Sequence, residues 1–206
     1  MTGTLAGRTI LMSGGSRGIG LAIALRAARD GVEALEAIMS FEPVKKYDLM
    51  QDINCRGSFL LAKAALPHLI DSDHAHVLSL SPPINLAPHW AGGHLGYTIA
   101  KYGMSLVTLG LAQEWREHGI AANSLWPRTA IDTAAVRTFM GAETADTRSR
   151  TPEIMSDAAH AILVRDPAEC TGEFFIDDDV LAQEGITDFS AYGPDVSQLV
   201  PDLFLD

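Results

Sequence analysis

The chain has 206 residues, 47% of them hydrophobic, and a formal net charge of −11. This length and hydrophobic fraction are enough to bury one full core, so we expect residues 1–206 to form a single domain. An acidic chain without a basic tract is repelled by phosphate backbones, which argues against nucleic-acid binding. No apolar run approaches the ~18 residues of a membrane span, and no signal-peptide pattern opens the chain, so a cytoplasmic protein is predicted.

The beginning of the chain has the pattern strand, glycine loop, helix. Residues 9–12 form a short apolar run, residues 12–20 read MSGGSRGIG, and residues 18–30 have apolar side chains at helical spacing. No lysine follows the last glycine, which excludes a phosphate-binding loop of the G-K-S/T type.

The glycines of this loop are a candidate dinucleotide site. Gly14 permits a sharp turn, Gly18 lets a phosphate approach the backbone, and Gly20 lets the helix pack closely. The helix N-terminus would then present free N–H groups to a pyrophosphate. Glycines at strand ends also serve turns alone, and that alternative stays open on this loop by itself.

The rest of the chain alternates between helix and strand patterns. The expected elements are a helix over 48–70, a strand over 76–81, a helix over 97–118, a strand over 120–126, a helix that begins at Thr151-Pro152-Glu153, and a strand over 173–177. This alternation predicts an α/β fold with a Rossmann-type, doubly wound parallel sheet and ligands at the carboxyl ends of its strands.

A tyrosine and a lysine share one face of the helix expected over 97–118. Tyr97 and Lys101 are four residues apart, which places the phenol and the ammonium about one turn from each other. A tyrosine that donates a proton near neutral pH needs a stabilised phenolate, and a fixed cation supplies that. Such a pair alone usually lies on a surface. Here it follows a glycine loop and a strand that ends in Ser81, which favours a catalytic role.

These motifs, in this order, resemble the short-chain dehydrogenase/reductase family, and within it the hydroxysteroid dehydrogenase-like subgroup with its bacterial members. The matching stretches are SGGSRGIG, Asn54 in DINCRG, Ser81 in LSPPINL, Tyr97 and Lys101 in YTIAKYGMS, and NSLWP before Thr133. The resemblance covers nearly the whole chain.

The resemblance implies an NADP(H)-dependent oxidoreductase that moves a hydride between nicotinamide and a carbonyl or secondary alcohol substrate. Tyr97 would be the acid/base, and Lys101 would stabilise its phenolate and hold the nicotinamide ribose. Ser81 would hydrogen-bond the substrate oxygen, and Asn54 would anchor a water.

The implied cofactor contacts come from the glycine loop, the catalytic helix and the loop after the strand at 120–126: Gly14, Ser16, Arg17, Gly18, Ile19, Gly20, Tyr97, Lys101, Pro127 and Thr129. Arg17 favours NADP(H) over NAD(H), because the family's NADP-preferring members often carry a basic residue there. The family also implies a homodimer or homotetramer that pairs through the helices at 48–70 and 97–118, where the small residues Gly103, Ser105 and Gly110 suit either subunit contacts or packing within one chain.

A second class of function remains open. In the family's register Pro82 occupies the usual serine position and Ser81 precedes it. A non-catalytic nucleotide-binding protein, with a regulatory or scaffold role on the same fold, is therefore the alternative.

The remaining polar residues favour ordinary structural roles. Arg128 stands where the family has glycine, and a solvated side chain is favoured over an anion ligand. His89 and His94 lack carboxylate or cysteine partners, so no metal site is predicted. The acidic run Asp177–Asp179 at a strand end is expected to be solvated.

The stretch between Gly31 and Phe41 is too short for the family's sheet, whose strand order is 3-2-1-4-5-6-7. Only 40 residues separate Gly14 from Asn54, and they contain no strands 2 to 4. A first strand without partners would bury unpaired N–H and C=O groups at about 1–3 kcal/mol each. We therefore expect one or more mobile segments to be missing from the chain, with Gly31–Val32 as the first candidate junction. A crystal of such a chain is expected to hold no cofactor.

Overall fold

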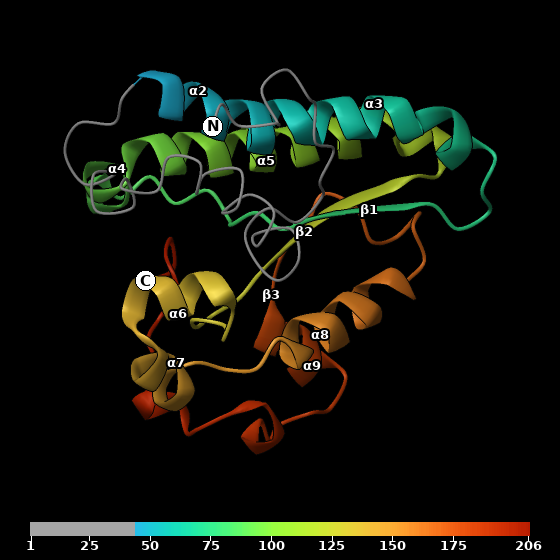
Figure 1. The fold of residues 1–206 in the computed structure, drawn as a ribbon. Coiled ribbons are helices and arrows are strands. Elements are labelled where there is room, and N and C mark those ends of the chain that lie inside the picture. Colours follow the sequence, from blue (N-terminus) through green and yellow to red (C-terminus); the bar gives the residue numbers. More distant parts are fainter. Residues whose placement is uncertain (1–43) are drawn as a thin grey trace.

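A computed structural model describes residues 44–206 (Figure 1). Its sheet has three parallel strands, which lie side by side in chain order: β1 (His76–Ser79), β2 (Ala121–Trp126) and β3 (Phe174–Ile176). His76 lies opposite Ala121, and Ser124 lies opposite Phe174. Every residue of β2 is buried, as expected of a central parallel strand covered on both faces. The α/β class and the parallel sheet are confirmed.

Helices cover both faces of this sheet (Figure 1). On one face lie α3 (Gly57–Ile70) and α5 (Leu95–Glu114), and on the other lie α8 (Glu153–Leu163) and α9 (Asp177–Gln183). Alternate residues of β1 face the two layers. Val77 packs with α3 and α5, whereas Leu78 packs with α8 and α9.

The other described elements are short. They are α2 (Val44–Gln51), a π-helical turn (Asp52–Arg56), α4 (Pro88–Gly93), α6 (Ala134–Met140), α7 (Ala142–Arg148) and the 3₁₀ turns Arg116–His118, Ser190–Tyr192 and Val196–Gln198. The helices α6 and α7 follow β2, and Figure 1 places them with the C-terminal end of the chain below α4 and α5. The first strand, the glycine loop and the junction at Gly31 all lie outside the described residues.

The helix expected over 48–70 is interrupted. It begins at Val44 and contains the π-helical turn Asp52–Arg56, in which the Gly57 N–H bonds to both Asp52 O and Asn54 O. Apolar residues recur at helical intervals through this turn, so the sequence pattern does not reveal it. Such turns are frequent at functional sites.

The π-helical turn packs closely against α5. A Cβ atom on Gly103 would lie only 2.7 Å from Cys55 Sγ, so this glycine is required by packing within the chain. Ser105 is also used internally, because its buried Oγ donates to Pro82 O at 2.6 Å. Gly110, by contrast, has open space around it. Two of the three small residues on α5 therefore have roles within one chain.

Candidate active site

The helix α5 brings Tyr97 and Lys101 together. Lys101 Nζ lies 5.9 Å from the centroid of the Tyr97 ring. The Lys101 side chain is fully buried, and its ammonium donates to Leu80 O at 3.1 Å and lies 3.6 Å from Met104 Sδ. Tyr97 is only partly buried. A phenol open on one side thus lies beside an enclosed cation.

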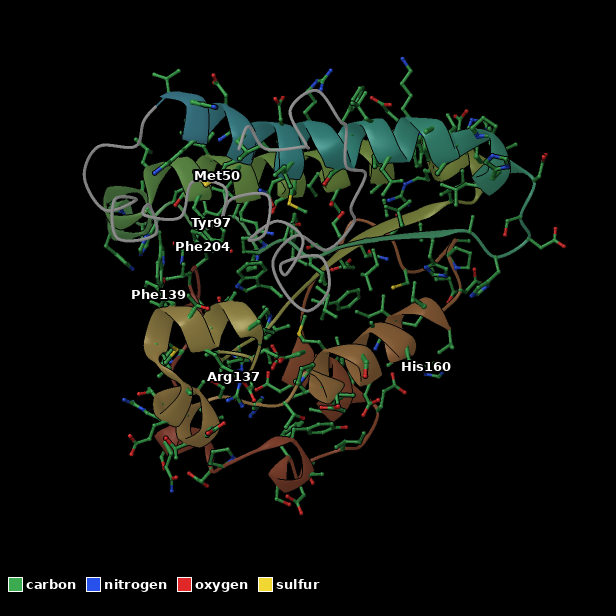
Figure 2. All side chains as sticks on the ribbon, viewed as in Figure 1. Met50, Tyr97, Arg137, Phe139, His160 and Phe204 are labelled. Atoms are coloured by element: carbon green, nitrogen blue, oxygen red, sulfur yellow. The ribbon has the colours of Figure 1, made fainter. Side chains whose placement is uncertain are left out.

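Two further aromatic rings lie beside the pair formed by Tyr97 and Lys101. Lys101 Nζ lies 5.5 Å from the centroid of the Trp126 ring at the end of β2. The Phe204 ring lies 6.1 Å from the Tyr97 ring, and the two planes differ by 18°. Figure 2 shows Tyr97 and Phe204 between α5 and α6. Phe204 is a site residue that no sequence motif indicated.

Ser81 follows the end of β1 on the α5 side of the molecule. It is fully buried, and its Oγ has no hydrogen-bond partner among residues 44–206. The bond from Lys101 to Leu80 O brings the ammonium within one residue of Ser81. The serine proposed for catalysis is therefore close to Lys101 along the backbone, and its buried hydroxyl has no partner within residues 44–206.

Asn54 lies in the π-helical turn, which packs against α5. Its side-chain nitrogen donates to Met50 O at 3.0 Å, while its buried Oδ1 has no partner within the described residues. Its main-chain oxygen accepts a hydrogen bond from Ser58 Oγ at 2.7 Å. Buried polar atoms are seldom left unpaired, so Oδ1 is a place where a bound water or ligand group would fit.

Pro127 and Thr129 lie just beyond the carboxyl end of β2, and both are buried. Thr129 forms an antiparallel bridge with Pro201, and Ala130 N donates to Val200 O at 2.8 Å. The loop expected to contact the cofactor therefore packs against the C-terminal part of the chain. The other expected cofactor residues, Gly14, Ser16, Arg17, Gly18, Ile19 and Gly20, lie outside the described residues.

The sequence-based expectation was wrong for Arg128, which is paired with carboxylates rather than simply solvated, and for two of the three acids in the run. Arg128 Nε donates to Asp178 Oδ1 at 2.7 Å, its NH2 lies 2.7 Å from Asp179 Oδ1, and its main-chain N donates to Asp177 Oδ1 at 2.8 Å. Asp177 and Asp178 are buried, and only Asp179 is exposed. The acids begin α9 directly after β3, where the helix dipole favours negative charge.

The charges in this network are strongly coupled. Burial alone would lower the pKa of Arg128, but its hydrogen bonds and its attraction to Asp178 and Asp179 outweigh burial and raise that pKa. Arg150, itself buried, reaches the same carboxylate, with its NH1 3.2 Å from Asp178 Oδ2. Asp178 thus holds two arginines, which fixes the loop after β2 against the start of α9.

Residues 44–206 contain no group of three or more His, Cys, Asp or Glu side chains that could hold a metal ion. The expectation that His89 has no carboxylate partner was wrong, because its Nε2 lies 3.7 Å from Asp206 Oδ1, although the side chain is exposed. Within the same residues, no helix has the length and apolar character needed to cross a membrane.

Comparison with known proteins identifies the relatives of this chain. The family model described as Enoyl-(Acyl carrier protein) reductase matches residues 35–166. Hydroxysteroid dehydrogenase-like protein 2 from Danio rerio is 39% identical over 274 aligned positions, which include 100% of this chain and 65% of the relative. The chain thus spans just under two thirds of the length of this curated relative.

Two solved structures are also similar. A putative dehydrogenase from Xanthomonas campestris is 42% identical with a TM-score of 0.76, and the match covers 94% of this chain and 96% of that one. A short-chain dehydrogenase from Mycobacterium thermoresistibile is 36% identical with a TM-score of 0.73, covering 90% of this chain and 69% of that one.

The alignment with the zebrafish protein also bears on the length of the chain. Its 274 positions include all 206 residues of this chain, which leaves at least 68 positions of the relative without a counterpart. The expectation that the chain is shortened is confirmed against this relative, whereas a missing mobile segment at Gly31–Val32 stays a prediction. From the family model, the relatives and the parallel sheet together, the chain belongs to the short-chain dehydrogenase/reductase family of oxidoreductases.

Proposed function

We propose that the protein transfers a hydride between NADP(H) and a carbonyl or secondary alcohol substrate, with Tyr97, Lys101, Ser81 and Asn54 as its catalytic residues. The burial of the Lys101 ammonium beside the Tyr97 ring carries this proposal. Burying a cation is costly, and this one is retained where a phenolate would form. An ordinary surface pair would leave the ammonium in water.

The proton is moved by the chain's own residues. The Tyr97 hydroxyl gives its proton to the substrate oxygen in reduction and takes it back in oxidation, and Lys101 stabilises the phenolate in between. The Ser81 hydroxyl donates a hydrogen bond to the same oxygen as charge develops on it. Asn54 anchors a water that links Lys101 to solvent. The bound nicotinamide supplies or accepts the hydride.

The residues present fit a nicotinamide cofactor. Lys101 would hold the ribose hydroxyls, and Pro127 and Thr129 would contact the cofactor, since they follow the carboxyl end of β2, where open α/β sheets bind ligands. The Oδ1 of Asn54, which has no partner in the described part of the chain, supports a water or ligand group close to α5. The cation of Arg17 supports NADP(H) rather than NAD(H), because it would pair with the 2′-phosphate.

Replacing Tyr97 with phenylalanine tests this reaction. Turnover is expected to fall at least about 100-fold, the usual contribution of a general acid, while cofactor affinity stays largely intact. Tyr192→Phe is the matched control, because its hydroxyl bonds Asp157 in the α8 layer, away from Tyr97. Unchanged turnover in Tyr97→Phe would refute the proposed role of this residue.

The cofactor and the enzymatic reaction are tested together. NADPH and NADH are titrated by fluorescence, and a panel of carbonyl compounds is then screened for cofactor consumption. Tighter binding of NADPH is expected, with consumption by at least one compound. Binding without any consumption would favour the alternative, a non-catalytic nucleotide-binding protein with a regulatory or scaffold role.

We also propose that the protein is a cytoplasmic homodimer or homotetramer. Large apolar side chains remain exposed on α3 and α5, namely Phe59 (50%), Ile99 (40%), Leu106 (60%) and Leu109 (38%). Such a surface favours association. A sedimentation mass of 22.1 kDa at micromolar concentration would contradict the assembly, and recovery in a membrane or secreted fraction would contradict the location.

A further inference from the structure

We propose that Phe204 is a positioning residue for Tyr97, which holds the phenol ring in the orientation that proton transfer requires. This inference rests on the proposed reaction and adds a residue that lies 107 positions from Tyr97 in the sequence. Its basis is the set of contacts that Phe204 makes at the end of the chain.

Phe204 is only 1% exposed and lies at the centre of an aromatic cluster. Besides Tyr97, its ring lies 5.1 Å from Tyr102, 5.8 Å from Trp90 and 6.0 Å from Trp126. Its backbone φ is +75°, a conformation that a bulky side chain rarely adopts. Strained residues persist only where their surroundings hold them in place. The surroundings here are the rings beside Tyr97.

The segment Val200–Asp206, called the C-terminal segment below, is also held by hydrogen bonds that do not involve the Phe204 ring. Leu203 O accepts from Trp126 Nε1 at 2.9 Å, and Phe204 O accepts from Asn85 Nδ2 at 3.3 Å. Asp202 N donates to Arg128 O at 2.9 Å. The backbone of this segment is therefore expected to keep its path when only the Phe204 ring is changed.

The Tyr97 ring is bounded by the ammonium of Lys101 and by the nearly parallel ring of Phe204. Lys101 is fixed by its bond to Leu80 O. Without the Phe204 ring, the phenol could rotate, and its hydroxyl would then leave the position from which it donates a proton to the substrate oxygen. A displacement of about 1 Å at a reacting group can cost 100-fold in rate, so the loss should appear in kcat.

The test compares Phe204→Leu, Phe204→Met and Phe204→Tyr. The first two remove the ring, whereas the tyrosine keeps it. We expect kcat to fall at least about tenfold in the Leu and Met variants and to stay within about threefold in the Tyr variant, with the cofactor dissociation constant unchanged in all three. Phe189→Leu is the matched control, because Phe189 packs beside a different tyrosine, Tyr192, with ring centroids 6.5 Å apart.

Thermal unfolding is recorded for every variant to show that it is folded. Because the Leu and Met variants both remove the ring, the test can still be made if one of them does not fold. A wild-type kcat in either folded variant would overturn the role of Phe204. So would an equal loss of kcat in Phe189→Leu. Absence of turnover in the wild type would instead refute the proposed reaction. In that case the ring contact is still tested by ¹³C-tyrosine NMR, where Phe204→Leu must shift the Tyr97 resonance, and an unmoved resonance overturns the contact.

Discussion

Replacing Asp178 with alanine is expected to lower the free energy of unfolding by about 3–5 kcal/mol, the range for breaking a buried ion pair from one side. The Asp178 side chain is 11% exposed and contacts Arg128 Nε and Arg150 NH1. Arg150, whose side chain is 4% exposed, would keep a buried charge without its carboxylate. Its guanidinium also lies 5.1 Å from the centroid of the Phe189 ring, so the loss should fall toward the lower end of that range.

The neighbouring Asp179 provides the control. It also pairs with Arg128, at 2.7 Å, but its side chain is 59% exposed. Surface pairs contribute about 0–1 kcal/mol, so Asp179→Ala should cost far less than Asp178→Ala. Urea unfolding measures both variants, and an unchanged slope with denaturant shows that the comparison is valid. Equal losses in the two variants would refute the argument that burial, rather than pairing, determines the cost.

Two further substitutions and one pH series follow from the packing. Gly103→Ala should destabilise the protein by about 1–3 kcal/mol because its Cβ would lie 2.7 Å from Cys55 Sγ. Gly110→Ala, at an open and exposed site on the same helix, should instead stabilise by up to about 1 kcal/mol; urea unfolding distinguishes the two. Burial, with a smaller effect of His74, lowers the pKa of His76 in the folded protein. As the pH falls, His76 is therefore protonated in the unfolded chain before it is protonated in the folded one. Stability is therefore lost as pH falls from about 6.5, and melting temperatures at pH 7.5 and 5.5 should differ less in His76→Gln than in the wild type.

Elements with strong apolar periodicity could be predicted from the sequence. The strands β1 and β2 and the helix α5 lie within a few residues of their expected bounds, because alternation and helical spacing are local properties of the chain. The strand expected over 173–177 ends at Ile176, because Asp177 begins α9. The π-helical turn at Asp52–Arg56 was not predicted, since it spans only five residues and apolar residues continue at helical intervals on both sides of it.

Residues whose role depends on a distant partner could not be assigned in this way. The sequence shows three consecutive aspartates, but the arginines that bind them lie 28 and 50 residues away from Asp178. Charged residues on a loop are usually solvated, and only the fold reveals that Arg128 and Arg150 meet one carboxylate. Phe204 gave no signal for the same reason, because the rings around it come from α4, α5 and β2.

The candidate site has two parts, of which one can be predicted from a sequence motif and the other depends on contacts between distant residues. The helix α5 and the end of β1 supply Tyr97, Lys101 and Ser81, whose spacing forms a local motif. The loop after β2 supplies Pro127 and Thr129, and it is held from two sides, since Arg128 N donates to Asp177 while Arg128 O accepts from Asp202. The second contact belongs to the segment that also carries Phe204. The backbone of Arg128 thus ties the loop that carries Pro127 and Thr129 both to the start of α9 and to the segment that places the Phe204 ring beside Tyr97.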